Sequence, residues 1–433
     1  MISKSALLLY YKRKEIQEKI LENSIGREVA VRYNDNFGKR PDCLQYPKDV
    51  IEFAKRGATS FHVSEERWKN VQALSPMLRK DELDELRTGW DLVLDIDCKV
   101  LEYSREAAIL VMGALKSQGV SSATIKFSGN KGFHIGIPYK AMPKRISGEE
   151  TSRMFPEAAR RVAQYIKHLI QEPLAARIME IEKNFSAIVE KTKKTAAEIT
   201  MHERDGWGSE KPRLNTEAFL DIDTILISSR HLYRSSYSLH EKSGLASIPL
   251  KNLSDFSVEN AKPDKVSADI VFLDDNKAEA GEAARLFTQS FDYKPQFAVE
   301  KRQEREETVS ETRIPESYFP PCMTNILAGL SDGRKRAIFV MLNFLTKAGW
   351  SYDEIEALLR EWNKKNQQQL REQEIVGPIR YHKQHRKKVL PPNCSSTMYY
   401  KDIGVCKPDW LCSKIKNPVN YSMLKVRRSG QNK

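Results

Sequence analysis

The chain has 433 residues, enough for two or three domains with substantial cores. Its 71 Lys and Arg residues outnumber its 58 Asp and Glu residues, and the net charge of +13 favours a polyanionic partner, nucleic acid first. No apolar run approaches the roughly 20 residues of a membrane span, and the N-terminus lacks a signal-peptide pattern. We therefore expect an intracellular, cytoplasmic and nucleoid-associated protein without a membrane partner.

Hydrophobic periodicity predicts a mixed α/β domain (α+β) over residues 1–273. Within it, the segment 148–215 is rich in Ala, Glu, Lys and Arg, which predicts a solvated helical insertion. The expected elements, in chain order, are a helix over 2–22, strands over 27–33 and 90–97, a helix over 104–118, and strands over 123–127, 132–138, 219–227 and 246–250.

The composition then changes. Residues 274–316 are charged and poor in large apolar side chains, which predicts a linker. From residue 317 to 433 the pattern is mainly helical, with apolar stripes over 336–348 and 352–366. The sequence thus predicts a second domain that is mostly α-helical.

Two carboxylates stand out at the end of an apolar run, Asp95 and Asp97. On a strand, side chains at i and i+2 point to the same face, so the two carboxylates could bind one divalent cation. We expect them at the carboxyl end of their strand, where α/β sheets usually carry chemistry.

A Ser- and Gly-rich turn follows one strand later, in the sequence SGNKGFH over residues 128–134. Such a turn offers backbone N–H groups to a phosphate, and Lys131 and His134 add basic side chains. Metal-binding carboxylates beside a phosphate-binding turn predict a nucleotidyl-transfer site.

A third segment contains Asp221 and Asp223 and, from Arg234, the pattern R-x-x-x-S-L-H-x-K-S-G-L. Taken together, the three motifs resemble the catalytic small subunit of archaeo-eukaryotic DNA primases, over residues 1 to about 275. The resemblance implies a primase-polymerase catalytic core of α/β class. It also implies three carboxylates that bind two Mg²⁺ or Mn²⁺ ions, namely Asp95, Asp97 and a third aspartate. For the third we prefer Asp223, with Asp221 as the alternative.

The same resemblance implies a nucleotide-binding set. Asp221 and Glu241 are expected to be structural or solvated, and His231 is expected to be a packing or capping residue. Many relatives carry a zinc knuckle in this domain, but only Cys98 lies in the corresponding stretch, so we expect no zinc there. The implied nucleotide-binding residues are Arg27, Ser128, Gly129, Lys131, His134, Arg234 and His240.

Six cysteines in a reducing compartment are not expected to form disulfides. Cys43 and Cys98 are interpreted as small hydrophobic residues. The other four lie in the last third of the chain without the paired C-x₂₋₄-C spacing of zinc sites. They favour a four-iron, four-sulfur (4Fe–4S) cluster, with zinc as the alternative. These residues are Cys322, Cys394, Cys406 and Cys412.

This pattern resembles the iron–sulfur domain of the primase large subunit, over residues 320 to about 425. The resemblance implies that Arg334, Lys335 and Arg336 contact template and primer. A second basic stretch over 380–388 suits general phosphate contact. Trp410 could stack on bases or pack around the cluster, and the same two options hold for the tyrosines at 399–400.

The resulting hypothesis is a single-chain DNA primase, in which a catalytic domain and an iron–sulfur domain are fused. Its partners would be a single-stranded DNA template, nucleoside triphosphates and the primer, with replication proteins as further candidates. One alternative is a primase-polymerase of repair or of a mobile element that mainly extends primers. Another is a non-catalytic nucleic-acid-binding subunit, which would be expected to lose the carboxylates and the phosphate-binding turn.

Overall fold

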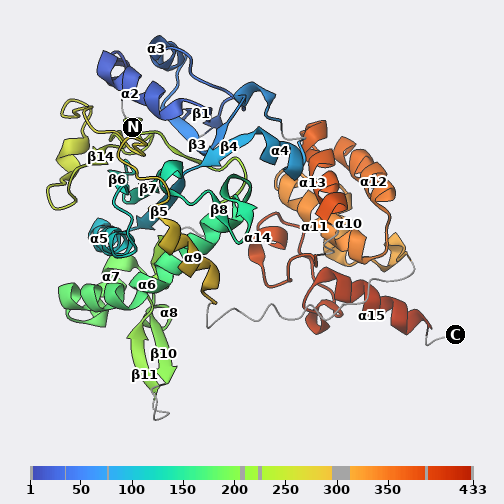
Figure 1. Ribbon diagram of the computed structural model, residues 1–433. Coiled ribbons are helices and arrows are strands. Elements are labelled where there is room, and N and C mark those ends of the chain that lie inside the picture. The colour runs from blue at the N-terminus through green and yellow to red at the C-terminus, as the bar shows by residue number, and fades with distance from the viewer. Residues whose placement is uncertain are drawn as a thin grey trace. The chain divides into compact units, whose positions relative to one another are not determined.

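The computed structural model describes residues 3–34, 36–75, 78–204, 210–222, 227–294, 313–385 and 389–430 (Figure 1). The chain divides into two compact units, residues 1–296 and 297–433. The first is a mixed α/β unit with antiparallel sheets and the second is helical, so the expected fold class is confirmed. No helix in the described ranges is both long enough and apolar enough to cross a membrane.

The first unit contains two antiparallel five-stranded sheets. In the first sheet the strand order is β13-β3-β1-β2, and β4 also pairs with β3. The strands of this sheet are β1 (Arg27–Tyr33), β2 (Asn36–Phe37), β3 (Ser60–Trp68), β4 (Arg87–Trp90) and β13 (Leu232–Arg234).

The second sheet has the order β12-β5-β7-β6-β14. Its central strands match the expected ones, but all neighbours are antiparallel. The rule for the carboxyl ends of parallel strands therefore does not explain the position of Asp95 and Asp97, which lie within β5 itself. The strands are β5 (Leu92–Cys98), β6 (Thr124–Phe127), β7 (Phe133–Ile137), β12 (Leu220–Ile222) and β14 (Pro249–Leu250).

Helices cover both sheets. The expected single helix over 2–22 is two helices, α1 (Lys4–Tyr11) and α2 (Lys14–Ser24). The break falls at Arg13, whose backbone is extended and whose guanidinium donates to carbonyl oxygens of residues 263 and 266. Helix α3 (Pro47–Lys55) packs on α1 and α2, α4 (Lys80–Leu86) precedes β4, and α5 (Leu101–Ser117) packs on β5 and β7.

The segment expected to be a solvated insertion is instead partly a layer of the core. Helix α6 (Glu157–Glu182) buries an apolar stripe that includes Val162, Ile166 and Ile170, and it packs against α5. It is followed by α7 (Phe185–Thr192), α8 (Ala196–Ile199) and a hairpin of β10 (Thr200–Arg204) and β11 (Glu210–Leu214).

The expected linker begins too early at residue 274. Helix α9 (Ala284–Asp292) contacts α6 and buries Leu286 and Phe287 in the core of the first unit. The charged run that suggested a linker, over residues 301–307, lies outside the described residues.

The second unit has its own core, which includes Met341, Phe344 and Trp362. The indole N–H of Trp362 donates to the carbonyl of Ile326 at 2.6 Å, which joins α12 to α10. Its helices are α10 (Pro321–Leu327), α11 (Arg334–Lys347), α12 (Tyr352–Lys364), α13 (Glu372–His385), α14 (Thr397–Tyr400) and α15 (Pro418–Gly430).

Candidate functional site

Strand β5 presents two carboxylates on one face. Asp95 and Asp97 are exposed, whereas Leu94, Ile96 and Cys98 between and beside them are buried. The alternation follows from the two-residue period of a strand. The expectation that the two carboxylates share a face is therefore met by the geometry of β5.

A third carboxylate lies beside this pair. Strand β12 is antiparallel to β5, and Asp221 stands directly opposite Asp97 with its side chain exposed. Directly opposed residues have Cβ atoms about 4.5–5.5 Å apart. The sequence analysis took Asp221 as structural and preferred Asp223, which lies outside the described residues. A repeated tetrapeptide, LDID at 94–97 and at 220–223, was the available signal.

His134 lies on β7, which pairs with β5 on the side opposite to β12. It is paired with Asp95 in the β5–β7 ladder, and its Nε2 is 3.4 Å from Asp95 Oδ1. Burial lowers the pKa of His134 well below its usual value, and the nearby cations of Lys126 and Arg234 lower it further. The imidazole is therefore neutral near pH 7. Its buried Nδ1 has no hydrogen-bond partner within the described part of the chain.

The turn before β7 is held by the side chain of Ser128. Ser128 Oγ accepts hydrogen bonds from the N–H groups of Gly132 at 3.2 Å and Asn130 at 3.4 Å. Gly129 has φ +94°, a conformation that favours glycine. At Gly132, a Cβ would lie 2.2 Å from the carbonyl oxygen of Ile96, so the turn approaches β5 as closely as only glycine allows.

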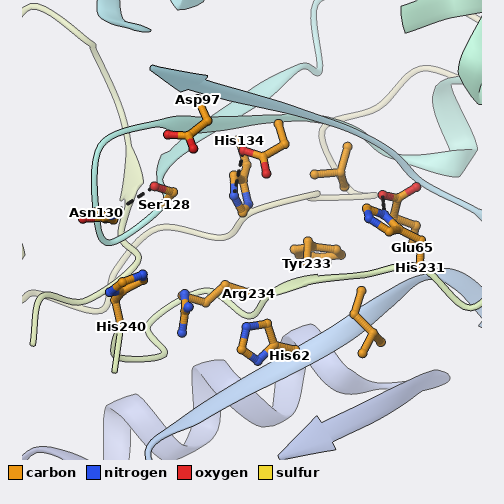
Figure 2. A pocket seen from close by; sticks show the side chains of 13 residues that line it. His62, Glu65, Asp97, Ser128, Asn130, His134, His231, Tyr233, Arg234 and His240 are labelled. Carbon is orange, nitrogen blue, oxygen red and sulfur yellow. Dashed lines mark hydrogen bonds and ion pairs between the residues drawn. The ribbon is translucent and has the colours of Figure 1, made fainter. Parts of the chain in front are cut away.

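Asp95 and Asp97 line one pocket of about 240 Å³ (Figure 2). Asp221 does not line it, but lines a second pocket to which Asp95 and Asp97 also belong. Of the nucleotide-binding residues expected from the sequence, the first pocket contains Ser128, His134, Arg234 and His240. It also contains residues that the sequence analysis missed or regarded as structural, namely His62, Glu65, Asn130, His231 and Tyr233.

Arg234 supplies a buried positive charge to the pocket. Its guanidinium donates to the carbonyl of Leu239 at 2.8 Å and pairs with Glu241 Oε2 at 2.9 Å. Arg32 pairs with the other oxygen of Glu241 at 2.8 Å. Glu241 is thus structural, as expected, and it is buried rather than solvated.

His240 is oriented by the backbone. Its Nδ1 accepts hydrogen bonds from the N–H groups of Lys242 at 3.3 Å and Ser243 at 3.2 Å. A neutral ring that accepts at Nδ1 carries its proton at Nε2. Burial, together with the charge of Arg234, lowers the pKa of His240 to about 4. His240 is therefore a neutral hydrogen-bond donor at physiological pH.

A fully buried lysine supports the pocket from beneath. Lys126 Nζ donates to the carbonyl of Arg234 at 2.8 Å and to Ser247 Oγ at 2.7 Å. Burial and the charge of Arg234 lower the pKa of Lys126 well below its usual value. Lys126 therefore fixes the backbone of Arg234. The available signal in the sequence was a single lysine between apolar residues of a predicted strand.

Glu65 and His231 lie at one end of the pocket in Figure 2, and Ser128 and His240 lie at the other end. Glu65 Oε1 and His231 Nδ1 are 2.7 Å apart, and Glu65 is fully buried on β3. His62, earlier on the same strand, has a buried Nδ1 without a hydrogen-bond partner in the described ranges. The pocket therefore offers polar atoms along its whole length.

Two expected nucleotide-binding side chains lie elsewhere. Arg27 is buried, donates to the carbonyl of Ser64 at 2.9 Å and pairs with Asp91, and it does not line this pocket. Lys131 is exposed and is also not among the lining residues, although its carbonyl accepts a hydrogen bond from Ser104. The charge of Arg27 is therefore paired within the fold, and its expected role at the nucleotide stays a prediction.

In the second unit, four cysteines line one cavity of about 430 Å³. Cys322 lies on α10, Cys394 and Cys406 lie on loops, and Cys412 begins a short 3₁₀ helix (Cys412–Lys414). Burial and the charges of the other three cysteines raise the pKa of Cys322 to about 12, which reflects their proximity. In the described ranges, no group of three or more His, Cys, Asp or Glu side chains has the spacing of a closed metal site.

The expected basic segment at the start of α11 is exposed or half-buried. Lys335 pairs with Glu374 at 2.7 Å, and Arg336 donates to the carbonyl of Met398 at 2.8 Å. In the second basic stretch, Lys383 pairs with Asp353 at 2.9 Å, and residues 386–388 lie outside the described part.

Comparison with known proteins finds a family match for the second unit. Residues 312–430 match the family model for the C-terminal domain of the eukaryotic and archaeal DNA primase large subunit. This match confirms the resemblance expected for the last third of the chain, and it covers that part alone.

Two further similarities are more limited. An uncharacterized protein of Methanocaldococcus jannaschii is 47% identical over 58 residues, which are 13% of this chain and 13% of that protein. The polymerase domain of Mycobacterium tuberculosis ligase D, solved in complex with DNA, is 17% identical with a TM-score of 0.37, covering 64% of this chain and 93% of that one.

We predict that Gly132→Ala destabilises the first unit, because the new Cβ would meet the carbonyl oxygen of Ile96 at 2.2 Å. Overpacking of this kind costs about 1–3 kcal/mol. Gly113→Ala is the matched control, since nothing lies within 4 Å of its Cβ position on α5 and helix propensity favours alanine by about 1 kcal/mol. Denaturant unfolding of both variants measures the difference, and equal stabilities would contradict the close approach.

A second prediction concerns pH. The unfolded chain binds a proton at His240 near pH 6.5, whereas the folded chain does so only near pH 4. Acidification through this window therefore lowers the free energy of unfolding. His240→Asn should flatten this part of the stability–pH curve, as measured by denaturant unfolding. The control is His168→Asn, at an exposed site on α6 that does not line the pocket; the same flattening there would contradict the assignment.

Proposed function

We propose that this chain is a DNA primase, a nucleotidyltransferase that makes short primers on single-stranded DNA from nucleoside triphosphates. The observation that carries the proposal is the pocket in which Asp95 and Asp97 face His134 and Arg234. The family match of residues 312–430 supports a primase-related function for the second unit. The combination of both functions in one chain is part of the proposal.

Three carboxylates would hold the catalytic ions. Asp95 and Asp97 share an exposed face, and Asp221 lies opposite Asp97. Carboxylate oxygens are the ligands that Mg²⁺ and Mn²⁺ prefer, so the donor set suits these ions. When bound, such ions lower the pKa of a primer 3′-hydroxyl and stabilise charge on the transferring phosphate. On this geometry we propose Asp221, rather than Asp223, as the third ligand.

The other residues of the pocket would bind the triphosphate. Arg234 offers a permanent charge, which Glu241 compensates only in part because Arg32 shares that carboxylate. His240 would donate through Nε2, and Ser128 and Asn130 line the part of the pocket where the phosphates would lie. Donors fixed before the substrate arrives need no reorganisation during the reaction.

The four cysteines would hold a 4Fe–4S cluster in the second unit. The supporting observation is that all four line one cavity, although they come from separate parts of the sequence. Thiolates suit iron–sulfur clusters and also zinc, which remains the alternative. A bound cluster would join the beginning of this unit to its end, because Cys394 lies 72 positions after Cys322 in the sequence.

The decisive experiment is primer-free synthesis on single-stranded DNA, with labelled NTPs and dNTPs supplied separately. New products from either set of nucleotides would support a primase. Products only when a primer is present would instead indicate a primase-polymerase that extends strands, and no products in either case would indicate a non-catalytic subunit.

We predict that Asp95→Asn, Asp97→Asn and Asp221→Asn each reduce synthesis about a thousandfold or more, since ion binding contributes several kcal/mol to catalysis. Binding of single-stranded DNA should persist. Asp223→Asn should cost less than Asp221→Asn, and the reverse order would restore Asp223 as the third ligand. Asp292→Asn, at an exposed site on α9, is the control.

For the cysteine site, anaerobically purified protein should contain about four iron and four sulfide per chain. Cys322→Ser should lower the iron content and destabilise the second unit, whereas Cys43→Ser in the first unit should change neither. Metal analysis with the visible absorption spectrum tests this, and about one zinc per chain without absorption would select the alternative.

A further inference from the structure

Trp410 is a large aromatic residue whose side chain is exposed to solvent. Its side chain is 65% exposed, whereas the adjacent Leu411 is 3% exposed. The indole therefore does not pack around the cysteine cavity, which was one of the two options in the sequence. Tyr400 takes that option, because it is 2% exposed and donates to the carbonyl of Pro392 at 2.7 Å.

The loop that carries Trp410 is fixed from within. Asp409 Oδ1 accepts from the N–H groups of Leu411 at 3.0 Å and Cys412 at 3.1 Å. Its other oxygen accepts from the hydroxyl of Tyr421 on α15 at 2.7 Å. Ser413 Oγ donates to the carbonyl of Trp410 at 2.9 Å. An exposed aromatic side chain on a fixed loop loses little conformational entropy when a ligand covers it.

Two cationic side chains lie over the indole ring of Trp410. Arg428 of α15 lies 4.8 Å from the ring centroid and Lys414 lies 5.7 Å from it. Residues 401–430 hold seven Lys and Arg residues and two Asp residues. A base that stacks on the indole would therefore leave its flanking phosphates near cations, which is the usual composition of a site for single strands.

We infer that Trp410, Lys414 and Arg428 form a stacking site for one unpaired base of single-stranded DNA, and we call them the Trp410 platform. The inference rests on the proposed function for the choice of DNA as the ligand. The Trp410 platform shares no residue with the basic start of α11, at residues 334–336, that the family resemblance implies.

The test compares two oligonucleotides of equal length with the full chain, dT₂₀ and an abasic strand that keeps the phosphates but lacks the bases. Trp410→Leu should weaken binding of dT₂₀ by about five- to a hundredfold, the usual contribution of one stacked base. It should leave binding of the abasic strand unchanged. Trp410→Phe, which keeps an aromatic face, should retain most of the affinity for dT₂₀.

The two cations should behave differently. Arg428→Gln and Lys414→Gln should weaken both strands, and each should reduce the slope of log K against log salt by about 0.7, the single-strand value per phosphate contact. Far-UV circular dichroism and iron content, unchanged across the variants, exclude a loss of folding.

Equal affinity of Trp410→Leu and the unaltered chain for dT₂₀ would overturn the inference, as would an equal loss for the abasic strand. Neither result affects the proposed function, because primer synthesis is measured separately. Conversely, if the protein makes no primers but binds dT₂₀ as expected, the inference about the Trp410 platform stands and the proposed function fails.

Discussion

The candidate site depends on the register of β5 between its two antiparallel neighbours. This pairing places Asp95 beside His134 on β7 and Asp97 beside Asp221 on β12. A shift of one residue would turn both β5 carboxylates into the core, since side chains alternate between faces. The buried Leu94 and Ile96 oppose such a shift, and the close approach of Gly132 to the carbonyl of Ile96 fixes the turn at the same point. Packing on one face of the strand therefore determines the chemistry on the other.

Buried ion pairs hold the walls of the pocket in place. Asp91 is fully buried and pairs with Arg27 and Arg67, while Glu241 holds Arg234 towards the pocket. Loss of one partner of such a pair leaves an uncompensated buried charge and costs about 3–5 kcal/mol. The net stabilisation by an intact pair is small, so these pairs mainly specify one arrangement of side chains. Arg27, which the family resemblance placed at the nucleotide, contributes in this way from a distance.

The sequence predicted those parts of the site that local patterns encode. Alternation identified the face of β5, and the Ser–Gly turn identified Ser128 and His134. His62 and Glu65 were missed because no strand was expected over residues 60–68, and only long-range pairing brings β3 to the pocket. Lys126 was missed because a lysine in a predicted strand is expected to be exposed. Arg234 meets His62 through the pairing of β13 with β3, across more than 160 residues of sequence. The composition of residues 274–316 suggested a linker, yet α9 within that range buries Leu286 and Phe287 in the core of the first unit.

The donor groups of each proposed metal site would repel one another when ionised, which does not favour folding by itself. This holds for the carboxylates of β5 and β12, and burial, together with the proximity of the other three cysteines, raises the pKa of Cys322. On the proposed function, bound cations would convert this repulsion into attraction. The two donor sets differ in kind, oxygen in the first unit and sulfur in the second, and thus prefer different ions. Each unit has its own core, so each site can be altered while the other unit stays folded.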